Sequence, residues 1–232
     1  MNAADLDNPI WAALRSRHAA SARGSSLALR YPSAMAPFAA VPSADSDADA
    51  ALDTLIDGDE TVYFLGCSPR VSQAWSLHAY APLAQMICPE PLAPIDGPEA
   101  IELSDVHRAD VMDLTALVYP HYFRADTMAM GRYFGIYENG RLAAMIGERM
   151  GTDRCQEISA ICTHPDFNGR GYARRLLAML TNATLERGRL PFLHVSHENV
   201  RAKGLYEQIG YRHRGDIGFW SLRRAQHRGS EQ

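Results

Sequence analysis

One stretch, from Gln156 to Gly188, constrains the fold more than any other. It reads "QEISAICTHPDFNGRGYARRLLAMLTNATLERG". A strand-like apolar run stops at Pro165, a loop containing Gly169 and Gly171 follows, and apolar residues then recur at helical spacing. This order predicts a strand, a short glycine loop and an amphipathic helix that Gly188 ends. Because glycine at a helix start costs stability, the backbone there is expected to admit a ligand closely.

The first turn of the predicted helix carries Arg174 and Arg175, where the helix dipole is already positive. Unpaired backbone N–H groups at such a start form a phosphate site, so an anion is expected there. A plain turn with arginines facing water stays the alternative. Two other phosphate motifs do not fit, because the chain lacks G-x-x-x-x-G-K-[ST] and Arg174 stands where a dinucleotide fingerprint needs its third small residue.

Composition limits the classes of function. The chain has 232 residues, 47% of them hydrophobic, and a net charge of −4, which fits one or two globular domains. Residues 151–232 hold 13 basic and 8 acidic side chains, which suits an anionic ligand. The overall pI near 6.1 argues against nucleic acid.

Location and metal content are also expected from simple patterns. No apolar run is long enough for a membrane span, and the first twenty residues are acidic and arginine-containing rather than signal-like. We therefore expect a cytoplasmic protein. The four cysteines form no C-x-x-C pair and no histidine stands at ligand spacing from them, so no metal site is expected.

A proline-rich stretch divides the chain. "CPEPLAPIDGPEA" (residues 88–100) has the composition of a linker, which places a domain boundary near residue 97. We expect a small α/β half at 1–97, a second domain at 98–225 and a flexible tail at 226–232. Local patterns predict a helix in 8–21 and strands in 25–31, 61–67 and 73–87. After the boundary they predict a helix from Ser104 to Pro120 and a hairpin at Asn139-Gly140.

Two motifs in the second part resemble those of the GNAT superfamily of acyl-CoA-dependent N-acyltransferases. "NGRGYA" is similar to the Arg/Gln-x-x-Gly-x-Gly/Ala signature, with Asn168 where Arg or Gln is usual. "ENVRAKGLYEQIGYRHRG" is similar to the family's Asn-x-x-Ala-x-x-Leu-Tyr-x-x-x-Gly-Phe/Tyr block. The matching positions there are Asn199, Ala202, Leu205, Tyr206, Gly210 and Tyr211. The resemblance covers about residues 100–222 and is closest to the FR47-like branch.

The resemblance implies a mixed α/β fold: a central twisted sheet with splayed parallel strands, preceded by a smaller, degenerate α/β half. It implies direct transfer of an acyl group, with acetyl-CoA the expected donor, to a primary amine of a small molecule or peptide. We expect the reaction to need no metal, and we expect the protein to bind neither nucleic acid nor a membrane. The protein is expected to be a monomer or a homodimer.

The resemblance also implies where acetyl-CoA binds. The backbone of Ile161, Cys162 and Thr163 would pair with the pantetheine arm. Asn199 would be a further contact, although an N-cap is the other interpretation of this residue. The pyrophosphate would rest on the glycine loop, which comprises Asn168, Gly169, Arg170, Gly171, Tyr172, Ala173 and Arg174.

Tyr206 is the candidate general acid, because a phenol with a pKa near 10 can donate to a departing thiolate. The alternative is a core tyrosine. Glu157 is the candidate base, acting through water, with burial expected to raise its pKa towards neutrality. A solvent-facing glutamate is its alternative, and His194, His197 or water could replace it. A nucleophilic Cys162 is disfavoured because the family transfers directly.

Two other classes of function remain open at this stage: a non-catalytic acyl-CoA-binding or regulatory module, and a thioester hydrolase. The intact block from Asn199 to Tyr206 favours the enzyme. The resemblance implies that the acceptor is set by residues 118–130 and by whatever the amino-terminal half contributes. Tyr119, Tyr122 and Phe123 could line that pocket or pack in the core.

Overall fold

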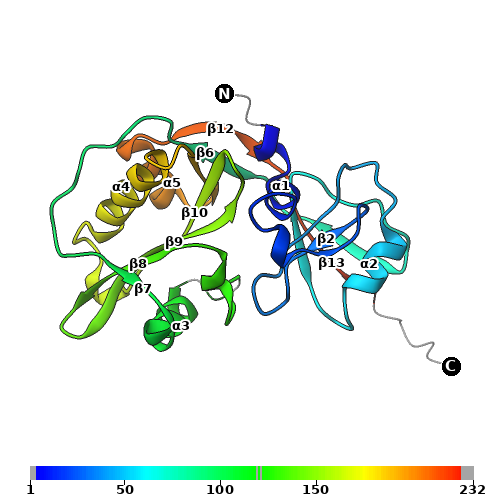
Figure 1. Ribbon diagram of the computed structural model, residues 1–232, viewed down its shortest axis with the longest axis horizontal. Coiled ribbons are helices and arrows are strands. Elements are labelled where there is room, and N and C mark those ends of the chain that lie inside the picture. Colours follow the sequence, from blue (N-terminus) through cyan, green and yellow to red (C-terminus); the bar gives the residue numbers. More distant parts are fainter. Residues whose placement is uncertain (1–3, 119, 121, 226–232) are drawn as a thin grey trace.

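The computed structural model describes residues 4–118, 120 and 122–225. Its main element is a seven-stranded sheet with the order β12-β6-β11-β10-β9-β8-β7 (Figure 1). Its strands are β6 (Leu83–Ile87), β7 (Ile101–Leu103), β8 (Tyr133–Glu138), β9 (Arg141–Gly151), β10 (Cys155–Thr163), β11 (Leu190–Ser196) and β12 (Arg212–Ile217). Strands β10 and β11 pair in parallel and the other neighbours are antiparallel. The predicted mixed α/β fold is therefore confirmed.

Helices cover both faces of this sheet. Helix α4 (Tyr172–Leu185) and helix α5 (Val200–Ile209) lie on one side, and α3 (Arg108–Val118) lies on the other (Figure 1). Successive side chains of β9 point to opposite faces of the sheet, because side chains alternate along a strand, and so they pack against different helices. Ala144 and Ile146 pack in the core that contains Leu177 of α4, whereas Met145 packs with Leu114 of α3.

Local predictions in this part are confirmed. Asn139 and Gly140 connect β8 to β9 with φ of 52° and 74°, the positive values that a two-residue hairpin turn needs. Ser104 and His107 form a capping box at the 3-10 turn η3 (Asp105–His107), and α3 follows directly. Two further 3-10 turns are η4 (Thr127–Met130) and η5 (Pro165–Phe167).

The amino-terminal part forms two small sheets, one of which needs a strand from the far end of the chain. One contains β1 (Arg23–Gly24), β2 (Leu29–Arg30) and β3 (Ala39–Ala40). The other has the order β4-β13-β5, with β4 (Val62–Leu65), β5 (Trp75–Ala79) and β13 (Phe219–Arg224). The remaining elements are η1 (Ala4–Asp7), α1 (Pro9–Leu14), η2 (Ala19–Ser21) and α2 (Asp49–Leu55).

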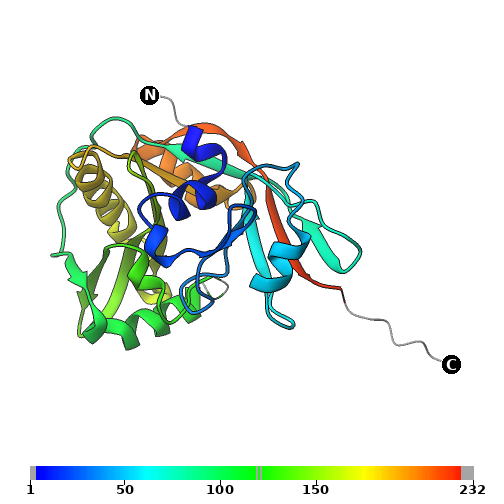
Figure 2. The same cartoon turned by 45° about the vertical axis from the view of Figure 1, so that its right-hand side comes forward.

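Helix α1 joins the two parts of the molecule. Ile10 and Leu14 of this helix share one core with Met150 of β9 and Leu65 of β4. Figure 2 shows the first segment of the chain, in blue, lying between the large sheet and the smaller ones. The same apolar cluster therefore holds the two parts together.

Strand pairing crosses the expected boundary near residue 97 in both directions. Strand β6 precedes that residue but lies between β11 and β12 in the large sheet. Strand β13 follows it but is the central strand between β4 and β5. The division into domains at 1–97 and 98–225 stays a prediction, and the tail at 226–232 lies outside the described residues. Within the described chain, none of the helices has the length and apolar character needed to cross a membrane.

Candidate active site

The site begins where two parallel strands separate. Pairing between β10 and β11 runs through Cys155–Leu190, Gln156–Pro191 and Glu157–Phe192 and then ends, although both strands continue. Just beyond this point β10 bulges, with Ala160 at a φ of 49°. Such values are sparsely populated for alanine and cluster at functional sites. The predicted splayed strands are confirmed, and they leave unpaired backbone facing a gap.

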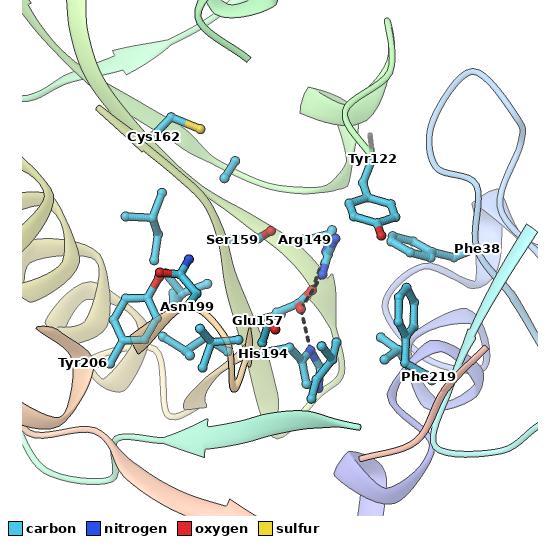
Figure 3. A pocket seen from close by; sticks show the side chains of 18 of the residues that line it. Phe38, Tyr122, Arg149, Glu157, Ser159, Cys162, His194, Asn199, Tyr206 and Phe219 are labelled. Carbon is cyan, nitrogen blue, oxygen red and sulfur yellow. Dashed lines mark hydrogen bonds and ion pairs between the residues drawn. The ribbon is translucent and has the colours of Figure 1, made fainter. Parts of the chain in front are cut away.

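A cavity of about 390 Å³ lies over this gap (Figure 3). This volume is in the range of small-molecule sites. Its lining comprises Phe38, Leu65, Leu83, Val118, Tyr122, Arg149, Glu157, Ile158, Ser159, Ala160, Ile161, Cys162, Leu193, His194, Val195, Ser196, Asn199, Tyr206 and Phe219. Five of the predicted site residues therefore meet in one cavity: Glu157, Ile161, Cys162, Asn199 and Tyr206.

Helix α5 supplies two of them. Asn199 is its N-cap, and its Oδ1 accepts a hydrogen bond from the Ala202 backbone N–H at 3.1 Å. The N-cap interpretation is confirmed, and the same residue lines the cavity. Tyr206 follows seven residues later, close to two helical turns, and so returns to the same face of the helix. It is 8% exposed and packs beside Tyr211 at 6.2 Å between ring centroids.

Glu157 lies in the wall of the cavity and is only 1% exposed. Arg149 donates from Nε and Nη2 to its two carboxylate oxygens, both at 2.7 Å. Burial raises the pKa of Glu157, but the Arg149 guanidinium and the bond from His194 outweigh it and hold the pKa at about 2. The expectation of a pKa near neutrality is wrong, because β9 places a cation directly beside this carboxylate.

His194 is fixed at both ring nitrogens. Its Nδ1 lies 2.8 Å from a Glu157 carboxylate oxygen, and its Nε2 lies 3.0 Å from Nε2 of Gln85. Arg214 donates to Oε1 of Gln85, which sets the amide so that its NH₂ faces the imidazole. Since an amide NH₂ donates, His194 accepts at Nε2 and donates from Nδ1 to the carboxylate. Both nitrogens are thus used inside the protein.

The other predicted groups differ in their access to the cavity. His197 is exposed, pairs with Asp216 at 2.9 Å and is not among the residues lining the cavity. Cys162 lines the cavity but is 1% exposed, and burial raises the pKa of its thiol to about 12. A thiol with that pKa is protonated at neutral pH and therefore a poor nucleophile.

The glycine loop opens to solvent rather than into the cavity. Gly169 and Gly171 both have a φ of +79°, and an added Cβ would meet no atom within 4 Å at either position. Gly171 is the N-cap of α4 and, having no side chain, forms no cap hydrogen bond to the first turn. Positive φ explains the glycines, and the open space lets a ligand approach the helix N–H groups.

Glu138 at the end of β8 holds this loop in place, a contact that the sequence interpretation missed. Its carboxylate accepts from Nη1 of Arg170 and from the Tyr172 hydroxyl. Of the remaining loop residues, Asn168 and Arg174 are exposed and Ala173 is half-buried. Thr163 ends β10 without reaching the cavity lining. Across the described ranges, no His, Cys, Asp and Glu side chains form a group that could hold a metal ion.

Aromatic residues form the side of the cavity farthest from α5. Tyr122 belongs to the segment expected to set the acceptor, whereas Phe38 and Phe219 were missed because they lie far apart in the sequence. Phe123 is buried against Tyr133, with ring centroids 5.8 Å apart, and does not line the cavity. Tyr119 lies outside the described residues.

Comparison with known proteins agrees with this geometry. The family model described as FR47-like protein matches residues 133–221. A crystal structure from Novosphingobium aromaticivorans DSM 12444, of a protein ascribed to the GNAT acetyltransferases, is 30% identical, with a TM-score of 0.85 and coverage of 95% of this chain and 99% of that one. A GCN5-related N-acetyltransferase from Kribbella flavida shares the fold at 14% identity, with a TM-score of 0.63 and coverage of 95% and 94%. The sequence matches no curated protein.

The chain therefore belongs to the GNAT superfamily of acyl-CoA-dependent acetyltransferases and is FR47-like.

Proposed function

We propose that this protein is an N-acetyltransferase that transfers the acetyl group of acetyl-CoA directly to a primary amine. The observation that carries the proposal is the end of β10–β11 pairing at Glu157–Phe192, with the cavity immediately beyond it. Unpaired backbone at this point can pair with the amide groups of the pantetheine arm. Family membership supplies the reaction class, and the acceptor is an amine of a small molecule or peptide.

The binding roles follow from position. The backbone of Ile161, Cys162 and Thr163 holds the pantetheine arm at the bulged end of β10, with Asn199 opposite. The loop from Asn168 to Arg174 holds the pyrophosphate, because its glycines leave the start of α4 open. Arg170 on the same loop pairs with Glu138, so with asparagine at position 168 the contact to the pyrophosphate falls to the backbone N–H groups.

Tyr206 is the general acid. It lines the cavity on the same helix face as Asn199, so its hydroxyl can reach the sulfur that leaves. Glu157 is too weak a base for this step, because Arg149 and His194 hold its pKa at about 2 and bond both of its carboxylate oxygens. Its role is to position Arg149 and His194, and the acceptor nitrogen loses its proton to water in the cavity.

The first test is thermal unfolding with and without acetyl-CoA, using NAD and ATP as controls. At about 100 times its dissociation constant, a ligand adds roughly 2.7 kcal/mol, which corresponds to a rise of about 5–10 °C in Tm for a chain of this size. The rise should be specific to acetyl-CoA and absent in Gly171→Glu. Release of CoA on adding amines then separates an enzyme from an acyl-CoA-binding module. No rise with any acyl-CoA would refute the proposal.

A further inference from the structure

Three rings converge on the cavity from separate parts of the chain. Phe38 precedes β3, Tyr122 follows α3, and Phe219 begins β13. Their ring centroids lie 6.2 Å apart for Phe38 and Tyr122 and 6.3 Å apart for Tyr122 and Phe219. Tyr63 supports this group from behind, 5.2 Å from Tyr122 and stacked on Phe219 at 5.5 Å. We call Phe38, Tyr122 and Phe219 the aromatic wall.

Two rings of the aromatic wall can meet a ligand. Phe38 is 2% exposed, and the Arg149 guanidinium covers its ring at 4.8 Å. Tyr122 and Phe219 are only half-buried, so their surfaces remain accessible. Leu65, Leu83 and Val118 continue the apolar surface around them. The accessible part of this side of the cavity is therefore aromatic and aliphatic.

The cavity offers no uncompensated negative charge among the described residues that line it. Arg149 and Glu157 are its charged side chains, and they neutralise each other in a buried bidentate pair. A second ammonium group on an acceptor, as in a polyamine, would lose its hydration there without gaining a partner. An acceptor with an apolar body has no second charge to dehydrate, and burying its apolar surface favours binding.

The aromatic wall stands opposite the proposed acid. Figure 3 shows Tyr206 and Asn199 on one side of Glu157 and the three rings on the other. If the pantetheine arm enters along β10 and α5, the attacking amine has to approach from the aromatic side. The wall is then a surface for the acceptor rather than for the donor.

We infer that the acceptor is a monoamine carried on an aromatic group, of the arylalkylamine kind, with its ring on Tyr122 and Phe219. This inference rests on the proposed function. In the reaction, the neutral nitrogen forms a bond to the carbonyl carbon of the thioester. The carbon–sulfur bond breaks with its electron pair on sulfur, nitrogen loses one proton, and sulfur gains one.

The test compares acceptors that differ in one property. CoA release is measured with 2-phenylethylamine, n-butylamine and spermidine, after acetyl-CoA binding has been established by the rise in Tm. We expect kcat/KM for 2-phenylethylamine to exceed that for n-butylamine by about tenfold or more, because ring contacts add to the burial of area. Spermidine is expected to be the poorest acceptor.

Variants then locate the preference. Phe219→Leu keeps an apolar side chain and should lower kcat/KM for 2-phenylethylamine about fivefold to tenfold while leaving n-butylamine nearly unchanged. Trp220→Phe is the matched control, because the next residue of β13 packs in a different core and points to the opposite face. It should leave the acceptor preference unaltered. Thermal unfolding of each variant shows that it folds.

The outcomes separate the two proposals. Absence of an acetyl-CoA effect on Tm overturns the proposed function and the inference together. Acetyl-CoA binding without turnover of any amine also overturns both, because the protein would then be an acyl-CoA-binding module. Acetyl-CoA binding with spermidine as the best acceptor, or with equal losses for both amines in Phe219→Leu, overturns the acceptor inference alone. So does a preference for phenylacetyl-CoA over acetyl-CoA without discrimination among amines, because the wall would then serve the acyl group.

Discussion

Arg149 and Glu157 form a bidentate ion pair inside the wall of the cavity, with both N–O distances at 2.7 Å. The carboxylate is 1% exposed and the arginine 8%. The two residues lie on neighbouring strands, β9 and β10, that run antiparallel. Because both charges are out of water, each depends on the other far more than an exposed pair would.

Removing one charge of this pair should destabilise the protein strongly. Glu157→Gln leaves a buried guanidinium without its counter-charge, so we expect the free energy of unfolding to fall by about 3–5 kcal/mol. Urea denaturation measures this. The double variant Glu157→Gln with Arg149→Met should recover much of the loss, because no unpaired charge remains. A double variant less stable than Glu157→Gln would show that the pair is not the source of the effect.

The same pair predicts an acid-labile contribution to stability. The pKa of Glu157 falls from an ordinary 4.5 to about 2 on folding. An acid whose pKa is lower in the folded than in the unfolded state stabilises the fold fully above its unfolded pKa. This contribution disappears as the pH falls from about 4.5 towards 2. The stability difference between wild type and Glu157→Gln should therefore be constant from pH 6 to 8 and shrink below pH 4.5. If the stability difference between the two proteins began to shrink already at pH 7, the pKa of Glu157 would lie near neutrality after all.

Tyr206→Phe should reduce turnover and leave the fold intact. Loss of a general acid costs about 10²-fold or more in kcat, whereas the KM for acetyl-CoA should change little. Tyr211→Phe is the control, since its hydroxyl bonds Thr181 at 2.7 Å in the core and should cost about 1 kcal/mol of stability without affecting kcat. Equal kcat values for wild type and Tyr206→Phe would remove Tyr206 as the acid.

The glycine loop can be tested with two equally strained positions. Gly171 and Gly188 have φ of 79° and 71°, and an added Cβ would meet no atom within 4 Å at either. Alanine at each should cost about 1–2 kcal/mol of stability. Only Gly171→Ala should also raise the KM for acetyl-CoA, because Gly188 lies at the other end of α4. If both variants raise it alike, general destabilisation explains the result.

Cys162 is expected to be dispensable for chemistry. With a thiol pKa raised to about 12 by burial, it cannot supply a thiolate at neutral pH. Cys162→Ala should lose some stability through the small cavity it leaves, and its kcat should stay close to that of the wild type. A hundredfold drop in kcat, or an acetylated enzyme seen by mass spectrometry, would point to a covalent route instead.

Features set by neighbouring residues could be predicted from the sequence. The hairpin at Asn139-Gly140, the turn with Gly188 that follows the end of α4 and the N-cap at Asn199 each depend on backbone preferences within a few positions. Two motifs with fixed spacing also placed Tyr206 and the glycine loop. The structure then brought Tyr206 together with Asn199 and the end of β10, as that order implies.

Features set by distant pairing could not be predicted. Nothing local in Leu83–Ile87 indicates that β6 lies between β11 and β12, or that Phe38 and Phe219 share a cavity. The expected pKa of Glu157 was wrong because its partner, Arg149, lies beside it only through the register in which β9 and β10 pair. A signal existed, since Arg149 interrupts an apolar strand, and a charge in such a position usually implies a buried partner.

The central position of β13 has a consequence for how this protein is made. Its neighbours β4 and β5 leave the ribosome early, yet they have no middle strand until residues 219–224 have been translated. Phe219 arrives with that strand. The aromatic wall is therefore complete only after both ends of the chain have paired, and a chain that stops before residue 219 lacks one ring of that wall together with the middle strand of its sheet.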